Sequence, residues 1–245
     1  MLVSRFSFDK EEKAKYNISM DNYFTRQIPL ISEDGYARLK EASVIVFGAG
    51  GVGGAVIEAL ARSGVGAITV VDADNIEESN LNRQILATVS SLGKSKAETG
   101  VERILSINPR CKANAKKLFY LPESASEIDL TAYDYVVDCI DTVTAKIFLA
   151  KECFEKNVKL ICSAGTGNKL DATAFKVADI FDTKVCPLCK VLRRELKKEG
   201  VPSLKVVYSE EEPKFDGRPP ASVSFVPTVA GFIIAGEVIK EIANV

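Results

Sequence analysis

Short apolar runs alternate with stretches of helical periodicity along the first two thirds of the chain. The runs are rich in valine and isoleucine, which is typical of strands buried on both faces of a parallel sheet. We expect a short N-terminal helical arm and then four strand and helix units that end near Ile161. Strands are predicted at residues 44–47, 67–72 and 133–141, and helices at 55–62 and from about 93–96 onward.

The last third of the chain is less regular. A strand is predicted at 173–177, a basic amphipathic helix at 185–199 and a buried apolar helix at 223–238 that is entered through Pro227. Between the two helices, residues 209–220 are acidic at first and rich in proline and glycine, which indicates a surface loop and a candidate lid. The whole pattern predicts an α/β fold of the Rossmann type: a doubly wound, mostly parallel sheet with an elaborated C-terminal half.

A glycine-rich turn directly follows the first predicted strand. It contains a GxGxxG pattern formed by Gly48, Gly50 and Gly53, with Gly51 beside it. The first two glycines allow a tight turn and a close approach to a ligand, and the third allows close packing of helix and strand. The free N–H groups at the helix beginning suit a phosphate. Alone, this pattern usually indicates a nicotinamide or flavin cofactor, so the residues after it decide the nucleotide.

Polar residues follow the second predicted strand, which ends on Asp72. That carboxylate lies about 20 residues after the glycines, a spacing suited to a ribose hydroxyl. The stretch behind it contains Asp74, Asn80 and Arg83, and Lys96 lies near the beginning of the next helix. A cation gains nothing from the dipole at a helix N-terminus, so Lys96 indicates an anionic ligand. All of these residues are expected at the carboxyl ends of the strands, where open α/β sheets bind ligands.

The strand predicted at 133–141 ends on two carboxylates, Asp138 and Asp141. Carboxylate oxygens suit a Mg²⁺ ion that bridges phosphates. An arginine, a lysine and an aspartate around a phosphate cradle favour a hydrolysable triphosphate over a dinucleotide, which needs neither a metal ion nor two cations. We therefore predict a site for ATP and Mg²⁺, with Arg83, Lys96 and Asp141 as catalytic residues and Asp141 as the metal ligand.

Together these motifs resemble the ubiquitin-activating-enzyme-like superfamily of adenylating enzymes. The resemblance rests on residues 48–54, Asp72-Ala-Asp74, Asn80-Leu-Asn-Arg83-Gln84, Gly93-Lys-Ser-Lys96 and Asp138-Cys-Ile-Asp141, and it extends from about residue 24 to 242. It implies one adenylation domain over 1–245, with a nucleotide-binding half at 24–165 and a substrate-side half at 166–245. The boundary is a glycine-rich loop near residues 163–167.

Two branches of this superfamily are relevant. One adenylates the C-terminus of small ubiquitin-like sulfur-carrier proteins, and the other activates the carboxylate of threonylcarbamoyladenosine in tRNA. The tail of this chain, with Pro187-Leu-Cys-Lys-Val-Leu-Arg-Arg194, Tyr208-Ser-Glu-Glu and residues 217–231, resembles the second branch, the tRNA threonylcarbamoyladenosine dehydratases. This implies an ATP-dependent dehydration that cyclises the modification through an acyl-adenylate.

The resemblance also assigns roles by position. It gives the phosphates to Gly48, Gly50, Gly51 and Gly53, the ribose to Asp72 with Asp74 beside it, the triphosphate to Asn80 and Arg83, the leaving pyrophosphate to Lys96 and Mg²⁺ to Asp141. Arg26 resembles an arginine that the superfamily donates across a dimer interface to the partner subunit's nucleotide. A homodimer is therefore expected.

Three other functions stay open. An adenylyltransferase would take a small carrier protein or a sulfur-transfer protein as its partner, and it usually has a tail that binds zinc through two CxxC pairs. A regulatory module would bind the nucleotide without turnover, but it would be expected to lack part of the set formed by Arg83, Lys96 and Asp141. A nicotinamide dehydrogenase would leave Asp141 and the two cations without a purpose.

Composition and charge agree with an enzyme of the cytoplasm. The chain has 245 residues, is 47% hydrophobic and has a net charge of -1. Its first ten residues lack the apolar core of a signal peptide, and the C-terminal apolar stretch is shorter than about 20 spanning residues, so no membrane partner is expected. The overall pI of about 5.8 does not itself indicate nucleic-acid binding. A local basic cluster, with Arg218 in the nearby loop, is a candidate contact for tRNA phosphates: Lys184, Lys190, Arg193, Arg194, Lys197, Lys198 and Lys205.

The six cysteines include one closely spaced pair, Cys186-Pro-Leu-Cys189, whose spacing suits a metal site or a redox pair. There is no second pair and no histidine, so four tetrahedral zinc ligands are hard to assemble. Cys139 and Cys162 are interpreted as small core residues.

Overall fold

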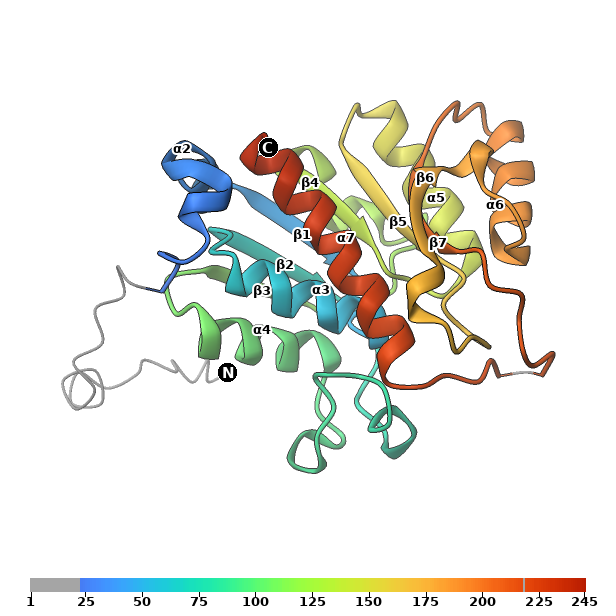
Figure 1. The fold of residues 1–245 in the computed structure, drawn as a ribbon, viewed down its shortest axis with the longest axis horizontal. Helices are drawn as coiled ribbons and strands as arrows, with labels where there is room; N and C mark the ends of the chain where they lie inside the picture. The colour runs from blue at the N-terminus through green and yellow to red at the C-terminus, as the bar shows by residue number, and fades with distance from the viewer. Residues whose placement is uncertain (1–22, 218) are drawn as a thin grey trace.

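The structure is a computed structural model that describes residues 23–217 and 219–245. The predicted lack of a signal peptide concerns residues 1–10, and the proposed phosphate contact of the loop concerns Arg218, so both lie outside the described residues. The described chain forms three layers, with a central sheet covered by helices on both faces (Figure 1).

The sheet has seven strands among the described residues, in the order β3-β2-β1-β4-β5-β7-β6. The strands are β1 (Ser43–Phe47), β2 (Ala67–Val71), β3 (Lys112–Lys116), β4 (Tyr135–Asp138), β5 (Leu160–Ala164), β6 (Phe175–Asp179) and β7 (Lys205–Ser209). Only the β6–β7 pair is antiparallel. The chain runs outward from β1 to β3 and then returns to β4 on the other side of β1. Ligands of doubly wound sheets bind at such a switch point, beyond the carboxyl ends of the strands.

Helices cover both faces of this sheet. They are α2 (Ile28–Glu41), α3 (Gly51–Arg62), α4 (Lys96–Ile107), α5 (Val143–Glu155), α6 (Pro187–Lys198) and α7 (Phe225–Ala243). Short 3-10 helices lie at Glu78–Asn80, Val89–Ser91, Ala125–Glu127, Leu130–Ala132, Ala172–Ala174 and Ile180–Asp182. Helices α2, α3, α4 and α7 share one face, while α5 and α6 lie on the other (Figure 1). The predicted α/β, doubly wound and mostly parallel fold is confirmed.

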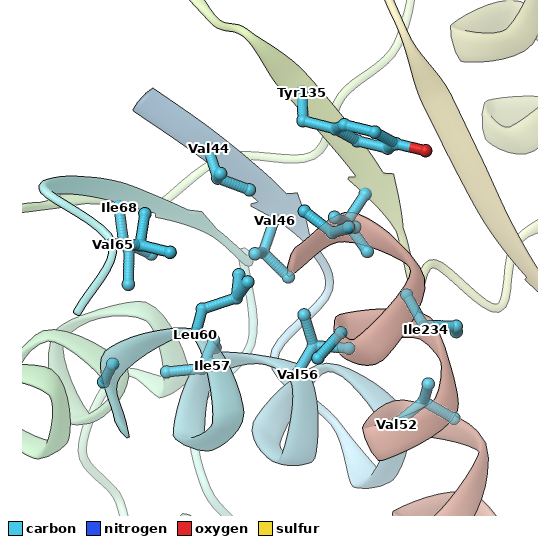
Figure 2. Packing of buried hydrophobic residues seen from close by; sticks show 14 of the residues in the cluster. Val44, Val46, Val52, Val56, Ile57, Leu60, Val65, Ile68, Tyr135 and Ile234 are labelled. Atoms are coloured by element: carbon cyan, nitrogen blue, oxygen red, sulfur yellow. The ribbon is translucent and has the colours of Figure 1, made fainter. Parts of the chain in front are cut away.

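Alternate residues of strand β1 pack against the helices on opposite faces of the sheet. Val44 and Val46 point to the face of α3 and α7, whereas Ile45 and Phe47 belong to the cluster beneath α5. This follows from the period of two along a strand. Figure 2 shows Val44 and Val46 packed toward Val56 and Leu60 of α3. The first strand is thus held from both sides, and its carboxyl end is a rigid platform for the glycine turn.

Helices α3 and α7 pack closely because small residues face each other. A Cβ added to Gly231 of α7 would lie 2.3 Å from the carbonyl oxygen of Val52 and 2.7 Å from Cβ of Ala55. Pro227 lies in the first turn of α7, where a missing N–H group leaves no hydrogen bond unmade. The helix begins two residues before Pro227 and buries one face, while Phe232 on its outer side is 43% exposed.

Several element boundaries differ from the prediction. The strand predicted at 173–177 begins at Phe175, because Asp171 accepts the N–H of Thr173 and starts a short 3-10 helix. The strand predicted to end on Asp141 ends at Asp138. No residue range was predicted for strands β3, β5 and β7. Strand β3 is a largely exposed, polar edge strand, so it lacks the apolar run that marks its neighbours.

The loop at 209–220 is held by the preceding glycine-rich segment. The side chain of Asn168 accepts the N–H of Ala221, and its backbone carbonyl accepts the N–H of Lys214. The carboxylate of Glu211 accepts the N–H groups of Leu170 and Asp171. These contacts fasten both ends of the loop to one segment, while its possible movement as a lid stays a prediction. In the described part of the chain, no helix is both long enough and apolar enough to cross a membrane.

Candidate functional site

The glycine turn lies between the end of β1 and the beginning of α3. Gly48 has a φ of +89°, and a Cβ there would lie 2.6 Å from the carbonyl oxygen of Cys139. A Cβ on Gly53 would lie 1.8 Å from the carbonyl oxygen of Gly48. Gly48 therefore has no room for a side chain in the tight turn. Gly53 has none at the contact between helix and strand, as the pattern predicts. A Cβ on Gly50 would meet nothing closer than 3.7 Å, so this part of the turn leaves room at its surface.

Asp72 follows β2 and fastens the glycine turn. Its Oδ2 accepts the N–H of Ala49 at 2.7 Å, and its Oδ1 accepts the N–H of Asp74 at 2.9 Å. Burial raises the pKa of Asp72, and the two backbone N–H donors only partly offset this effect. The carboxylate therefore shapes the turn, and each of its oxygens retains a lone pair for a further donor.

Lys96 begins α4 and reaches back to the end of β2. Its Nζ lies 2.9 Å from Oδ2 of Asp74, and its backbone N–H donates to the carbonyl oxygen of Asp74 at 3.0 Å. Ser95 caps the helix by accepting the N–H of Glu98 and forms an isolated bridge with Asn75. The Lys96 side chain is only 10% exposed. The segment after β2 and the beginning of α4 are thus joined around the buried Lys96 side chain.

The stretch with Asn80 and Arg83 folds against the glycine turn. Asn80 is buried, and its side-chain oxygen accepts the N–H of Glu77 at 3.1 Å. The Arg83 guanidinium donates to the carbonyl oxygen of Ser79 at 2.6 Å. A Cβ added to Gly51 would lie 3.4 Å from the carbonyl oxygen of Arg83, which places the two segments in contact.

Gln84 was not among the predicted site residues. It is 7% exposed, and a Cβ added to Gly50 would lie 3.7 Å from its Nε2. Its Oε1 is buried and has no hydrogen-bond partner within the described residues. An unpaired buried oxygen costs free energy, which often marks a functional position. The signal in the sequence was its place next to Arg83.

Asp141 lies just beyond β4, in the turn before α5. It is exposed, and the Thr142 hydroxyl donates to its Oδ1 at 3.4 Å. The glycine turn contacts the same segment, because a Cβ on Gly48 would lie 3.1 Å from the nitrogen of Ile140. Asp141 therefore directly follows a residue that contacts the glycine turn, and its carboxylate is exposed to solvent.

Asp138, the other carboxylate of this segment, has a structural partner that the sequence did not reveal. Lys146 of α5 lies with its Nζ 3.1 Å from Oδ1 of Asp138, and both side chains are almost completely buried. Lys146 also donates to the carbonyl oxygen of Ser163 at 2.8 Å. Burial alone would lower the pKa of Lys146, but the facing Asp138 carboxylate raises it above its usual value. This pair joins the ends of β4 and β5.

Arg26 does not join the other predicted site residues. It is exposed and precedes α2, and its neighbour Gln27 donates to the carbonyl oxygen of Ser63 at the end of α3. The glycine turn lies at the opposite end of α3, at its beginning. Twelve helical residues span about 18 Å, so Arg26 of one chain lies far from the turn of the same chain.

Two further predictions need correction. Lys205 was predicted in the basic cluster, but it lies in β7 and forms ion pairs with Glu237 and Glu241 of α7. Cys162 is a core residue as predicted, whereas Cys139 is only partly buried and packs against the core cluster.

A hollow of about 260 Å³ lies elsewhere, at the amino ends of the strands. It is lined by Tyr135, Phe154, Lys159, Leu160 and Lys205, among others. None of the predicted site residues lines it, so the chemistry of the chain does not point there.

A family model decides the relationship of this chain to known proteins. The ThiF family model matches residues 24–245. The chain belongs to the ThiF family. Individual relatives show how far along the chain this likeness extends.

Individual relatives match this chain to different extents. The tRNA threonylcarbamoyladenosine dehydratase of Bacillus subtilis (strain 168) is 40% identical over 242 residues, covering 91% of this chain and 95% of the relative. A sulfur carrier protein adenylyltransferase of Thermus thermophilus is 42% identical, but over 123 residues that cover 50% of this chain and 45% of the relative. The likeness to the first protein thus includes the C-terminal half.

Solved structures agree with this ThiF-family fold. The E. coli tRNA N6-threonylcarbamoyladenosine dehydratase in complex with ATP superposes with a TM-score of 0.85 at 30% identity, covering 97% of each chain. The same protein has been solved in complex with AMP. A related fold without close sequence similarity is seen in E. coli MccB, with a TM-score of 0.66 at 23% identity.

Proposed function

We propose that this protein dehydrates N6-threonylcarbamoyladenosine in tRNA, using ATP to activate its carboxylate as an acyl-adenylate. The observation that carries the proposal is the meeting of separate motifs at the glycine turn: Asp72 binds it directly, Arg83 and Gln84 pack on it, and Ile140 lies beneath it. The near full-length likeness to a dehydratase supports this substrate over a carrier protein. Residues 24–165 would bind the nucleotide, and 166–245 would form the substrate side.

In this reaction the chain acts by position and charge. The turn at Gly50 and Gly51 and the free N–H groups of α3 hold the phosphates, and Asp72 accepts a ribose hydroxyl. The substrate carboxylate attacks the α-phosphorus in line, and pyrophosphate leaves. Arg83 and Lys96 stabilise the negative charge that builds on the phosphoryl and pyrophosphate oxygens. A nucleophilic nitrogen or oxygen of the modification then closes the ring and expels AMP, so the net change is the loss of one water.

The donor set at Asp141 fits Mg²⁺. The described residues contain no group of three acidic, cysteine or histidine side chains that could enclose a metal ion. Mg²⁺ commonly uses one or two carboxylates together with substrate phosphates and water, and Asp141 is an exposed carboxylate beside the phosphate turn. When bound, the ion would neutralise phosphate charge, while Asp141 would fix its place.

The test of the proposed function uses tRNA that carries threonylcarbamoyladenosine. The tRNA is incubated with the protein, ATP and Mg²⁺, and its nucleosides are then analysed by mass spectrometry alongside an AMP assay. We expect the modified nucleoside to lose one water only when ATP is present. An unchanged nucleoside, together with adenylation of a sulfur-carrier protein, would replace the proposal by the adenylyltransferase function.

The contact with tRNA is proposed at α6. This helix buries Cys189, Leu192 and Leu196 on one side, so its other side carries the basic residues. Lys190 and Lys197 are exposed on α6 and Lys184 is exposed just before it, and phosphate contacts of this kind do not require a specific sequence. Since tRNA and ATP are substrates, the protein is expected to act in the cytoplasm.

Lys96 is expected to be essential for nucleotidyl transfer. We expect Lys96→Ala to lower pyrophosphate exchange with threonylcarbamoylated tRNA by about 100-fold, because a preorganised cation at the leaving group is lost. Lys94→Ala is the matched control, since Lys94 is exposed and faces Glu102 at 3.8 Å. It should change exchange by no more than about twofold, as exposed ion pairs contribute little. Equal effects of the two substitutions would contradict the role of Lys96.

Asp141→Asn is expected to change the metal requirement of the enzyme. The amide keeps the size of the side chain but removes its charge, so more Mg²⁺ should be needed for half-maximal AMP formation, by about tenfold or more. The exposed Asp182 provides the control as Asp182→Asn. If both variants give the wild-type Mg²⁺ titration, Asp141 is not the ligand.

A homodimer in which Arg26 serves the partner subunit's nucleotide is also proposed. Its distance from the glycine turn of its own chain supports a role in trans. The outer side of α7 offers an apolar surface for a second copy, since Phe225 and Phe232 are about half exposed and a Cβ on Gly236 would meet nothing. Both features stay predictions until a mixing experiment is done.

The mixing experiment uses two variants that are each expected to be inactive, Arg26→Ala and Arg83→Ala. In a mixed dimer, one site would combine Arg26 from one subunit with Arg83 from the other. Random exchange of subunits should therefore restore about a quarter of the wild-type AMP formation. Mixing that restores nothing, although subunit exchange is shown by mass, would contradict donation across the interface.

A further inference from the structure

Cys186 and Cys189 lie at the beginning of α6, away from the residues assigned to ATP. Cys186 is the N-cap residue and Cys189 lies in the first turn, so their side chains share one side of the helix. Both side chains are buried in the same apolar cluster, with Cys186 2% and Cys189 0% exposed. The two thiols are therefore neighbours on one face of the helix, and Cys186 lies where a helix best stabilises an anion.

The surroundings favour a thiolate at Cys186. The neighbouring Cys189 thiol, the N–H groups at the beginning of the helix and the charge of Lys169 lower the pKa of Cys186, although burial opposes this. The neighbouring Cys186 in turn raises the pKa of Cys189. By contrast, burial raises the pKa of Cys111 to about 11 and that of Cys153 to about 12. The pair thus consists of one activated thiol and one that keeps its proton.

The backbone before the pair is strained. Val185, a β-branched residue, has a φ of +63°, and the N–H of Cys186 donates to the carbonyl oxygen of Lys184 at 2.6 Å. This is a tight three-residue turn, a conformation that is rare and costly for such a side chain. Val185 is half exposed, while the Cys186 side chain is 2% exposed. Opening this turn would relieve strain and uncover the Cys186 sulfur.

We propose that Cys186 and Cys189 form a thiol–disulfide exchange site whose dithiol is oxidised reversibly by a disulfide such as oxidised glutathione. The Cys186 thiolate attacks one sulfur of the co-reactant, and the first thiolate leaves. Cys189 then loses its proton and attacks the Cys186 sulfur of the mixed disulfide, which expels the second thiolate. The protein loses two electrons and two hydrogens, and the co-reactant is reduced to two thiols.

Oxidation of the pair would change the packing at the carboxyl edge of the sheet. Gly165 directly follows β5 and has a φ of +67°, and a Cβ there would lie 2.4 Å from the Cys186 sulfur. The sulfur therefore fills the space beside this glycine. A disulfide draws the two sulfur atoms to about 2 Å, closer than two thiols that are not bonded to each other can approach. The packing against Gly165 must then change.

The experiment uses the full chain and oxidised glutathione. After incubation the sample is quenched with acid, alkylated and analysed by intact mass and peptide mapping. We expect the wild type to lose two hydrogens, with 186 and 189 linked in one peptide, and reduced dithiothreitol to reverse the change. Peptide mapping of the wild type needs no variant, so it decides the question even if a variant fails to fold.

Two variants separate the roles of the thiols. Cys189→Ser lacks the second thiol and should accumulate glutathione on Cys186. Cys186→Ser should react at Cys189 at least about tenfold more slowly, because the thiolate is lost. Cys111→Ala, a buried cysteine far along the chain, is the control and should behave as the wild type.

Two results would overturn the proposal. One is glutathione bound to other cysteines while Cys186 and Cys189 stay reduced. The other is a stoichiometric zinc ion that protects both thiols in the wild type and is lost in Cys186→Ser, which would make the pair a metal site.

Discussion

Arg83→Ala is expected to lower pyrophosphate exchange with threonylcarbamoylated tRNA by about 100- to 1000-fold, which is the usual loss when one preorganised charge donor is removed from a transition state. The backbone of Arg83 contacts the glycine turn, and one nitrogen of its guanidinium is held by the carbonyl oxygen of Ser79. This hydrogen bond already fixes the orientation of the guanidinium, so its other N–H groups need no further ordering to bind a phosphate. The side chain is not part of the core, so the melting temperature should change little.

Arg83→Lys provides the matched comparison. It keeps the positive charge but loses the planar fork that can hold two phosphate oxygens at once, so exchange should recover only in part. Exchange in Arg83→Ala at the wild-type rate would reject the site. A large loss of stability in Arg83→Ala would instead show that the residue acts through folding, which circular dichroism during heating would detect.

The parts of the site that could be predicted from sequence are those with a dense local pattern. Gly48 is required by its positive φ and Gly53 by its contact with Gly48, both within one strand, turn and helix unit, so their spacing along the chain carries the geometry. Asp72 follows from the length of the next unit. The contact between the stretch at Arg83 and the turn at Gly51, however, depends on how a loop folds back, and only the family resemblance brought them together.

The parts that were missed depend on pairing between distant residues. Strand β3 has a polar sequence, and only its register against β2 shows that it is a strand. Lys146 lies among apolar residues of α5, and no local pattern links it to Asp138. Lys205 was assigned to the basic cluster because it lies near the other basic residues in sequence, whereas its partners, Glu237 and Glu241, lie in α7.

Lys146→Met is expected to give the largest loss of stability, about 3–5 kcal/mol in the free energy of unfolding. Lys146 and Asp138 are 2% and 1% exposed, and the lysine binds three acceptors: Asp138, the carbonyl oxygen of Ser163 and the sulfur of Cys162. Methionine fills the same space but leaves the Asp138 carboxylate buried without its counter-ion. Denaturant unfolding with linear extrapolation measures the difference.

Lys151→Met is the control on the same helix, because Lys151 is exposed and pairs with Glu199 at 2.9 Å. It should change stability by less than about 1 kcal/mol. Adding Asp138→Asn to Lys146→Met removes the unpaired charge and keeps an oxygen for the N–H of Ile140, which Asp138 accepts at 2.9 Å. The double variant should therefore be more stable than Lys146→Met alone. If Lys146→Met loses no more stability than Lys151→Met, the buried pair does not hold β4 against α5, and the position of Asp141 needs another explanation.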